Sequence, residues 1–232
     1  MSLLSTPLLN GLPDETVAAF LTRVSYHTHP RGSRVFSEGD PGDRVLILLS
    51  GKVKVTRSGP VLLTMVGPGE LLGELCLFDA SPRQATATAV QEGDLCSIPA
   101  PAMLAWLEAH PCASLRMMRL LAERVRTMND RFEDASGVDV ATRVARVLVE
   151  QGGRFGRATR VGVRIRLDLS QDDLAHHVRA SRERVNQILG DFSRRGWIRR
   201  DGAELVVLDG QRLTGRARYR PESARRRPTL PQ

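Results

Sequence analysis

Cysteine is scarce in this chain of 232 residues, which carries only Cys76, Cys96 and Cys112. The three show neither paired nor Cys-x-x-Cys spacing, which argues against a disulfide framework, a zinc site and a four-thiolate iron–sulfur cluster. The five histidines form no metal-ligand or triad spacing near a lone nucleophile. We therefore expect neither a bound metal nor an enzyme.

Long apolar runs are missing as well, because none reaches the roughly 18 residues that a membrane span requires. The amino-terminal segment is apolar at Leu3-Leu4 and Leu8-Leu9 but lacks a charged leader region. We expect no membrane association and a reduced, cytoplasmic setting. Aromatic residues make up only 4%, yet an apolar fraction of 41% is compatible with globular packing in one or two domains.

Lysine is nearly absent, since 32 of the 34 basic residues are arginine. Residues 1–136 carry 13 basic and 15 acidic residues, whereas residues 137–232 carry 21 and 11. A nearly neutral first part and a strongly basic second part suggest a sensor or core domain joined to a polyanion-binding domain. The alternative is a basic surface that merely follows a basic proteome.

Short apolar runs punctuated by glycines fill residues 26–99, with runs at 44–49, 52–55 and 61–66. Regularly spaced glycine turns between short strands predict a β-barrel, sandwich or β-roll. A short helix is expected before them, over residues 13–24.

A helical pattern then runs from residue 102 to about 135. Six residues recur there at alternating three- and four-residue steps, as in the seam of a coiled coil: Leu115, Met118, Ala122, Val125, Asn129 and Phe132. The opposite face is charged, so we favour a dimer helix over a helix packed only on its own domain. Residues 136–139 end the helix and mark a domain boundary.

Beyond that boundary the sequence predicts a helix from Val140 to Leu148, an irregular stretch from Gly152 to Arg160, and a strand over 161–167. Residues 220–232 are rich in proline and arginine, and we expect them to be disordered.

Residues 169–189 have the pattern of a helix-turn-helix, with Ser170 and Ser181 as the two helix caps. Long polar side chains face outward near the start of the second helix: Arg182, Glu183, Arg184, Asn186 and Gln187. The major groove of DNA suits such side chains, because arginine pairs with guanine and glutamate accepts from cytosine. Two strands around an Asp201-Gly202 turn make this a winged variant.

The segment from Gly73 to Thr86 places a carboxylate, Glu74, nine residues before an arginine, Arg83. A ribose 2′-hydroxyl can donate to a carboxylate, and a phosphate suits a guanidinium together with backbone N–H groups at a helix start. An ordinary surface ion pair is the alternative interpretation.

This segment resembles the phosphate-binding cassette of cyclic-nucleotide-binding domains, in which Gly-Glu-Leu-small-Leu precedes Pro-Arg-small-Ala-Thr. The glycine-rich stretch from Gly32 to Val53 is similar to the β-roll of the same domains. Residues 180–186 and 195–199 look like the C-terminal domain of the cyclic-AMP receptor protein and fumarate–nitrate regulator family. The resemblance covers residues 13–215 and is greatest to actinobacterial cyclic-AMP receptor proteins.

The resemblance implies an α+β chain: a cyclic-nucleotide-binding β-roll over 1–110, a dimerisation helix over 111–136, a winged helix-turn-helix over 137–219 and a basic tail over 220–232. It also implies a homodimeric transcription regulator that binds cyclic AMP and a palindromic DNA operator, with RNA polymerase as a partner. Ligand binding would shift a hinge near residues 137–140.

The same resemblance implies two sets of site residues. The ligand-binding set is Gly73, Glu74, Leu75, Cys76, Arg83, Gln84, Met128 and Asn129. The DNA-binding set is Ser181, Arg182, Glu183, Arg184, Asn186 and Gln187.

Several positions depart from the family pattern. Gln84 replaces a serine that touches the phosphate, and Met128 replaces a threonine that bonds the adenine amino group. Arg184 and Gln187 change the DNA-reading face, and Arg179 replaces a turn glycine. Regulators that answer cyclic GMP, cyclic di-GMP or no ligand therefore remain alternatives.

Two weaker alternatives also remain. A haem-based sensor could use Cys76 as an iron ligand, although a small core residue fits that position better. A regulatory subunit of a kinase or channel shares the cassette, but the winged helix-turn-helix argues against it.

Overall fold

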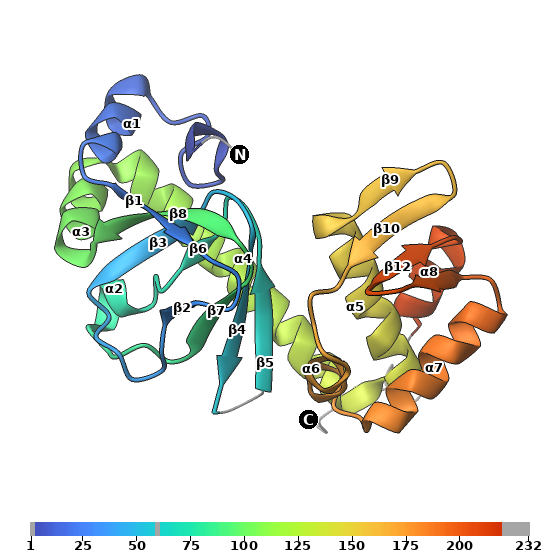
Figure 1. The fold of residues 1–232 in the computed structure, drawn as a ribbon. Helices are drawn as coiled ribbons and strands as arrows, with labels where there is room; N and C mark the ends of the chain where they lie inside the picture. Colours follow the sequence, from blue (N-terminus) through green and yellow to red (C-terminus); the bar gives the residue numbers. More distant parts are fainter. Residues whose placement is uncertain (1–2, 59–60, 220–232) are drawn as a thin grey trace, which may run out of the picture. The chain divides into compact units, whose positions relative to one another are not determined.

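The computed structural model describes residues 3–58 and 61–219, with side chains described outside 130–136. It forms two compact units, residues 1–126 and 127–232, shown in Figure 1. The long helix α4 (Pro111–Gly137) runs through the division between them.

The first unit consists of short strands flanked by helices. Its elements, in chain order, are η1 (Leu3–Ser5), α1 (Asp14–Leu21), β1 (Ser25–His29), β2 (Arg34–Phe36), β3 (Arg44–Leu48), β4 (Lys52–Arg57), β5 (Val61–Val66), β6 (Leu71–Leu72), α2 (Cys76–Asp79), β7 (Thr86–Gln91), β8 (Gly93–Pro99), α3 (Ala100–Ala109) and the first part of α4. The strands predicted between residues 26 and 99 are confirmed, as is the short helix before them.

Two antiparallel sheets of four strands, ordered β1-β8-β3-β6 and β2-β7-β4-β5, make up the body of this unit. Strand β3 is buried on both faces. Val45 and Ile47 pack against the helices, whereas Leu46 and Leu48 pack between the sheets. This double burial explains the unbroken apolar run at residues 45–49, because neither face of the strand meets solvent.

The predicted helix from residue 102 onward is two helices, α3 and α4, rather than one. His110 separates them with extended backbone angles (φ −130°, ψ 84°) because the ring of Pro111 disfavours helical geometry in the residue before it. Helix α3 is held to α1 through Trp106, whose Nε1 donates to Thr16 O at 2.9 Å and whose ring lies 4.8 Å from that of Phe20.

Helix α4 has two apolar faces. Ala113 and Met117 are buried in the core of the first unit. On the predicted seam, Leu115, Met118 and Val125 stay 47%, 58% and 55% exposed. Packing on its own domain therefore uses different residues from the seam, and the seam stays open. Phe132, also assigned to the seam, lies outside the described side chains.

The second unit combines a helical bundle with a small sheet. Its elements are the end of α4, α5 (Val140–Phe155), β9 (Arg157–Thr159), β10 (Gly162–Arg166), α6 (Gln171–His177), α7 (Arg182–Arg194), β11 (Ile198–Asp201), β12 (Glu204–Val207) and α8 (Gly210–Ala217). The sheet order is β11-β12-β10-β9. The predicted α+β fold, with a β-roll followed by a winged helix-turn-helix, is confirmed.

The irregular stretch predicted from Gly152 to Arg160 is wrong, because α5 continues through both glycines to Phe155. A Cβ at position 152 would lie 3.2 Å from Ile165 Cδ1, so glycine there lets the helix approach β10 closely. The stretch then enters strand β9. Residues 220–232, predicted to be disordered, lie outside the described residues.

Asp139 ties the start of α5 to α8. Its Oδ1 accepts from Thr142 N at 2.8 Å as an N-cap, and both carboxylate oxygens lie 2.6 Å from Arg216 Nη2. Burial raises the pKa of this carboxyl, but the bonds from Arg216 and Thr142 outweigh burial and hold the pKa below its ordinary value of 3.8.

We expect Asp139→Ala to lower the free energy of unfolding of the second unit by about 1 kcal/mol near neutral pH. Because the folded-state pKa is depressed, the contribution is complete above pH 3.8 and is lost as the pH falls through the lower folded-state value. Denaturant unfolding of wild type and variant across this range measures the difference. A difference that does not shrink with acidification would contradict the role of the carboxylate.

Arg179, in the turn between α6 and α7, has a left-handed backbone with φ +50°. That conformation strains a non-glycine residue, and the guanidinium also repels that of Arg143. We expect Arg179→Gly to raise the free energy of unfolding by about 0.5–1 kcal/mol. Arg179→Ala is the matched control, since it removes the charge but keeps the strain. If the two variants were equally stable, relief of backbone strain could not be the source of the stabilisation.

Candidate functional site

Two charged side chains are buried in the cassette segment between β6 and β7. Glu74 is 2% exposed and Arg83 is 4% exposed. Charged groups are seldom buried so completely unless they are paired or serve a ligand. The ordinary surface ion pair considered above is therefore wrong for these two residues, which do not lie on the surface.

The guanidinium of Arg83 is held by neutral carbonyl groups. Nη1 donates to Gly73 O at 3.0 Å, and Nη2 donates to Arg44 O at 2.7 Å. The guanidinium also lies 4.5 Å from the centre of the Phe36 ring. Asp43 Oδ1, at 4.0 Å from Nη2, is the nearest carboxylate oxygen among the described ion pairs of this group.

This surrounding leaves the positive charge of Arg83 only partly compensated. Its buried Nε has no hydrogen-bond partner among the described residues. A buried cation that bonds mainly to carbonyls gains energy from an added anion, because the anion supplies both charge and acceptor oxygens. The arrangement can therefore hold a phosphate.

Gly73 makes the close approach of Arg83 possible. Its φ is +72°, and a Cβ on this residue would lie 1.9 Å from Arg83 Nη1. Any side chain at this position would therefore displace the guanidinium as well as strain the backbone.

Glu74 is joined to helix α4 rather than to Arg83. Its Oε1 is ion-paired with Arg124 Nη1, and Arg124 Nη2 donates to Leu71 O at 3.0 Å. The carboxylate is thus fixed beside the cassette, where a sugar hydroxyl could share it. The sequence reasoning did not include Arg124 among the site residues.

The other predicted ligand residues have different surroundings. Cys76 is buried against Gly42, where a Cβ would lie 2.3 Å from Cys76 Cβ, so the thiol side chain fills the core of the cassette. Leu75 is 47% exposed, and Gln84 is also exposed. Met128 and Asn129 are exposed on α4 past the division between the units. Their contact with a ligand stays a prediction.

Among the side chains that the structure describes, no group of three or more His, Cys, Asp or Glu could hold a metal ion. In that same part of the chain, none of the helices has the length and apolar character to cross a membrane.

The helix-turn-helix is formed by α6 and α7, as predicted. Ser170 and Asp173 form a capping box at the start of α6, with Asp173 N donating to Ser170 Oγ at 3.0 Å. Ser181 caps α7 by accepting from Arg184 N at 3.2 Å. Val185 is buried on the inner face of α7. These caps and the buried face fix which side of α7 is presented outward.

The outer face of α7 carries the predicted DNA-reading residues. Arg182, Glu183, Arg184 and Gln187 are exposed, whereas Asn186 is half-buried. The pKa of Glu183 is held below its ordinary value by its own backbone N–H and by the Ser181 hydroxyl. The Glu183 carboxylate is therefore ionised near neutral pH and can accept a hydrogen bond from a base amino group.

The wing is the hairpin of β11 and β12. Its two-residue turn consists of Gly202 (φ +60°) and Ala203, since Asp201 pairs with Glu204 in the ladder. The predicted Asp201-Gly202 turn is therefore one residue out of place, because glycine takes the first central position. Arg164 of β10 supports the hairpin, with Nη1 at 3.0 Å from Asp201 and 2.7 Å from Glu204.

Comparison with known families agrees with this geometry. Residues 26–110 match the family described as Cyclic nucleotide-binding domain, and residues 142–216 match Crp-like helix-turn-helix domain. The first match contains the cassette with Glu74 and Arg83. The second contains α6, α7 and the wing.

Relatives and a solved structure match over most of the chain. The CRP-like cAMP-activated global transcriptional regulator of Mycobacterium tuberculosis is 40% identical, over 91% of this chain and 96% of the relative. The Cyclic AMP receptor protein of Thermus thermophilus is 29% identical, over 84% and 88%. FixK2 from Bradyrhizobium japonicum shares the fold at 17% identity, with a TM-score of 0.72 over 83% of this chain and 96% of that structure.

Proposed function

The chain belongs to the cyclic-AMP receptor protein and fumarate–nitrate regulator family of DNA-binding transcription regulators, which are not enzymes. From that premise, we propose that it is a homodimer whose affinity for DNA is controlled by cyclic AMP bound at the cassette. The observation that carries the ligand site is the burial of Glu74 and Arg83 in the cassette, where Arg83 bonds Gly73 O and Glu74 pairs with Arg124.

The cyclic phosphate is assigned to Arg83. Its guanidinium is already positioned, and its partners are carbonyl groups that a phosphate can replace or supplement. The ribose 2′-hydroxyl is assigned to Glu74, which accepts through the oxygen left beside the Arg124 pair. Both contacts use parts common to all cyclic mononucleotides and do not select the base.

Cyclic AMP is our first choice of effector because the 40% identical relative is named as cAMP-activated. Cyclic GMP is the second candidate. Met128 is the reason to test it, since a thioether sulfur cannot match the hydroxyl that would bond an adenine amino group, which weakens the case for adenine.

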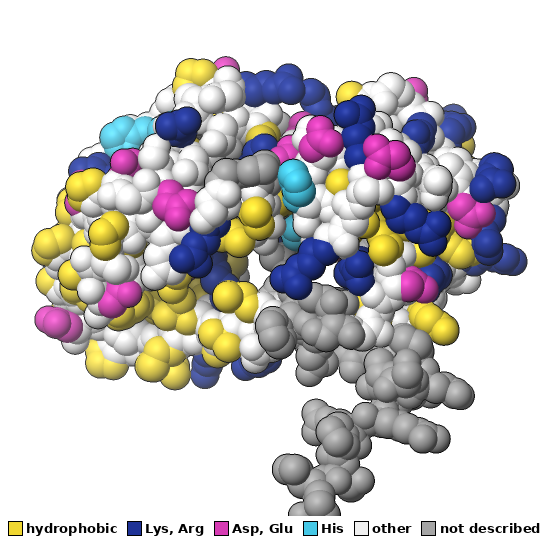
Figure 2. All heavy atoms as spheres, turned by 90° about the horizontal axis from the view of Figure 1, so that it is seen from below, with side chains coloured by type: hydrophobic (Ala, Val, Ile, Leu, Met, Phe, Trp, Pro, Cys, Tyr) yellow, Lys and Arg dark blue, Asp and Glu magenta, His cyan; other side chains and the backbone are white. Residues whose placement is uncertain are grey.

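The DNA partner is a duplex with two half-sites. The exposed seam of α4 offers Leu115, Met118 and Val125 to a second copy, and Figure 2 shows hydrophobic side chains gathered over the first unit. A dimer would present two copies of α7 to successive major grooves, which is why we expect a palindromic operator. RNA polymerase is the partner we assign to the DNA-bound form, by family membership alone.

Calorimetric titration of the purified chain with cyclic AMP and, in parallel, cyclic GMP tests the effector. Fluorescence anisotropy with labelled duplexes, with and without each nucleotide, tests the coupling to DNA. We expect micromolar or tighter binding of cyclic AMP and tighter DNA binding in its presence. Nucleotide binding that leaves DNA affinity unchanged would contradict the allosteric part of the proposal.

A further inference from the structure

Gln171, the first residue of α6, connects the two helices of the helix-turn-helix through one side-chain oxygen. Its Oε1 accepts from Arg182 Nε at 2.8 Å and from Asn186 Nδ2 at 3.0 Å. Arg182 and Asn186 are four residues apart and therefore share one face of α7. A single glutamine thus fixes two side chains of the outward face relative to α6.

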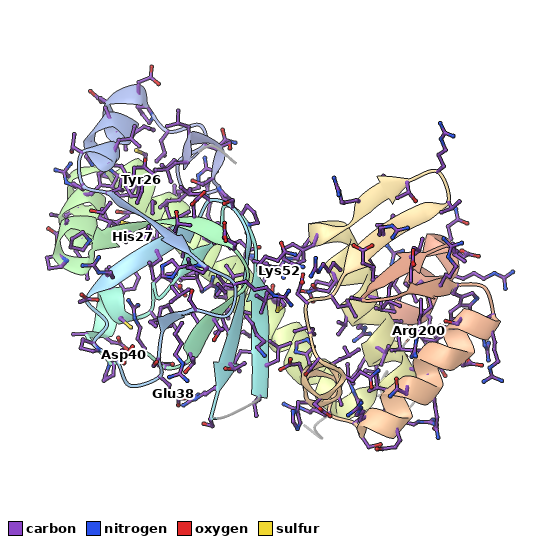
Figure 3. All side chains as sticks on the ribbon, viewed as in Figure 1. Tyr26, His27, Glu38, Asp40, Lys52 and Arg200 are labelled. Carbon is purple, nitrogen blue, oxygen red and sulfur yellow. The ribbon has the colours of Figure 1, made fainter. Side chains whose placement is uncertain are left out.

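The same network reaches the wing. Arg200 of β11 donates from Nη2 to Asn186 Oδ1 at 3.3 Å, and Figure 3 labels Arg200 in the second unit. Both polar ends of the Asn186 amide are therefore used within the protein. This position suits a residue that holds its neighbours, which differs from the direct base contact expected from the sequence.

The hydrogen bond to Gln171 leaves the two terminal nitrogens of the Arg182 guanidinium available for DNA. With Nε engaged, Nη1 and Nη2 remain to donate to O6 and N7 of a guanine. Asp172 Oδ2 lies 3.8 Å from Nη1, but the two side chains are 63% and 56% exposed, so this ion pair is weak. An arginine whose side chain is already oriented also loses less conformational entropy on binding.

We propose that Gln171 is a positioning residue that sets the base preference of the half-site by orienting Arg182. The inference rests on the proposed function, in that α7 must read DNA. The competing role is a contact between Gln171 and the DNA backbone. Such a contact would weaken binding to all duplexes alike and would leave the base preference unchanged.

The experiment begins with a duplex selected by the full wild-type chain from a randomised library. Every single-base variant of that duplex is then titrated with wild type, Arg182→Ala and Gln171→Ala. Arg182→Ala identifies the base pair that Arg182 reads. At that base pair we expect Gln171→Ala to reduce discrimination about fivefold, while affinity for an unrelated duplex changes less than about twofold.

Three further variants test how Gln171 acts. The double variant is expected to match Arg182→Ala alone at that base pair, because Gln171 acts through Arg182. Gln171→Glu keeps an acceptor oxygen and is expected to retain the base preference even if the added charge lowers overall affinity. Gln211→Ala, on the exposed part of α8, is the matched control and should leave every position unchanged.

The possible failures are distinguishable. Uniform weakening across all duplexes, or an unchanged preference in Gln171→Ala, would overturn the inference and leave the proposed function standing. A wild-type chain that selects no sequence from the library would overturn both.

Discussion

Replacing Arg83 with alanine is expected to weaken cyclic AMP binding about 100-fold, which corresponds to about 2.7 kcal/mol. The guanidinium is the buried cation of the cassette, and a charge-assisted bond to phosphate is the strongest single contact that the site can offer. Calorimetric titration of wild type and variant measures the change in affinity.

Controls for this prediction must separate charge from structure, because Arg83 also bonds Gly73 O and Arg44 O. Arg83→Lys keeps the charge but cannot make both bonds at once with a planar fork, so intermediate affinity is expected. Arg31→Ala changes an exposed arginine of the same unit and should bind as wild type does. Full affinity in a folded Arg83→Ala protein would contradict the phosphate assignment.

Val125→Glu is expected to convert the proposed dimer to a monomer and to weaken operator binding by about 1000-fold. A charge in the α4 seam would have to be buried without a partner at the interface, which is costly. The loss of operator affinity is large because a monomer binds through one recognition helix, whereas a dimer binds through two linked ones. Sedimentation equilibrium measures the oligomeric state, and anisotropy measures DNA binding.

Arg119→Glu is the matched control for Val125→Glu, since it places the same side chain at an exposed position on the charged face of α4. We expect this control to remain dimeric. Val125 is itself 55% exposed, so the variant should fold normally. A Val125→Glu protein that stays dimeric would show that the seam is not the interface.

The sequence predicted the elements with the clearest local signals. Glycine-spaced apolar runs identified the strands, and Ser170 and Ser181 identified the two helix starts because their side chains cap them. The failures also have local causes. Gly152 looked like a helix end, yet it is a contact point for Ile165 inside α5, and sequence alone does not show which of the two a glycine serves.

The hydrogen-bond partners of the polar site residues could not be predicted from the sequence. Arg83 bonds a carbonyl 39 residues away, and Gln171 bonds a residue 15 positions along the chain. Such contacts depend on tertiary packing, which short patterns do not encode. Arg124 did leave a usable signal, because it stands seven residues after buried Met117 on the same side of α4. An arginine on the inward side of a helix indicates a buried acceptor.

The hydrogen bonds that join α5 and its N-cap Asp139 to α8 have a consequence for synthesis of the protein. Arg146 Nε donates to Ala217 O across 71 residues, and Arg216 reaches back to Asp139. Helix α5 packs against α8 as well as β10 and α7, so the part of its apolar side that faces α8 has no final partner until α8 is made. At roughly 5–20 residues per second, that side waits several seconds or more for α8. During this interval the nascent second unit is exposed to aggregation, while the first unit already has its full set of strands.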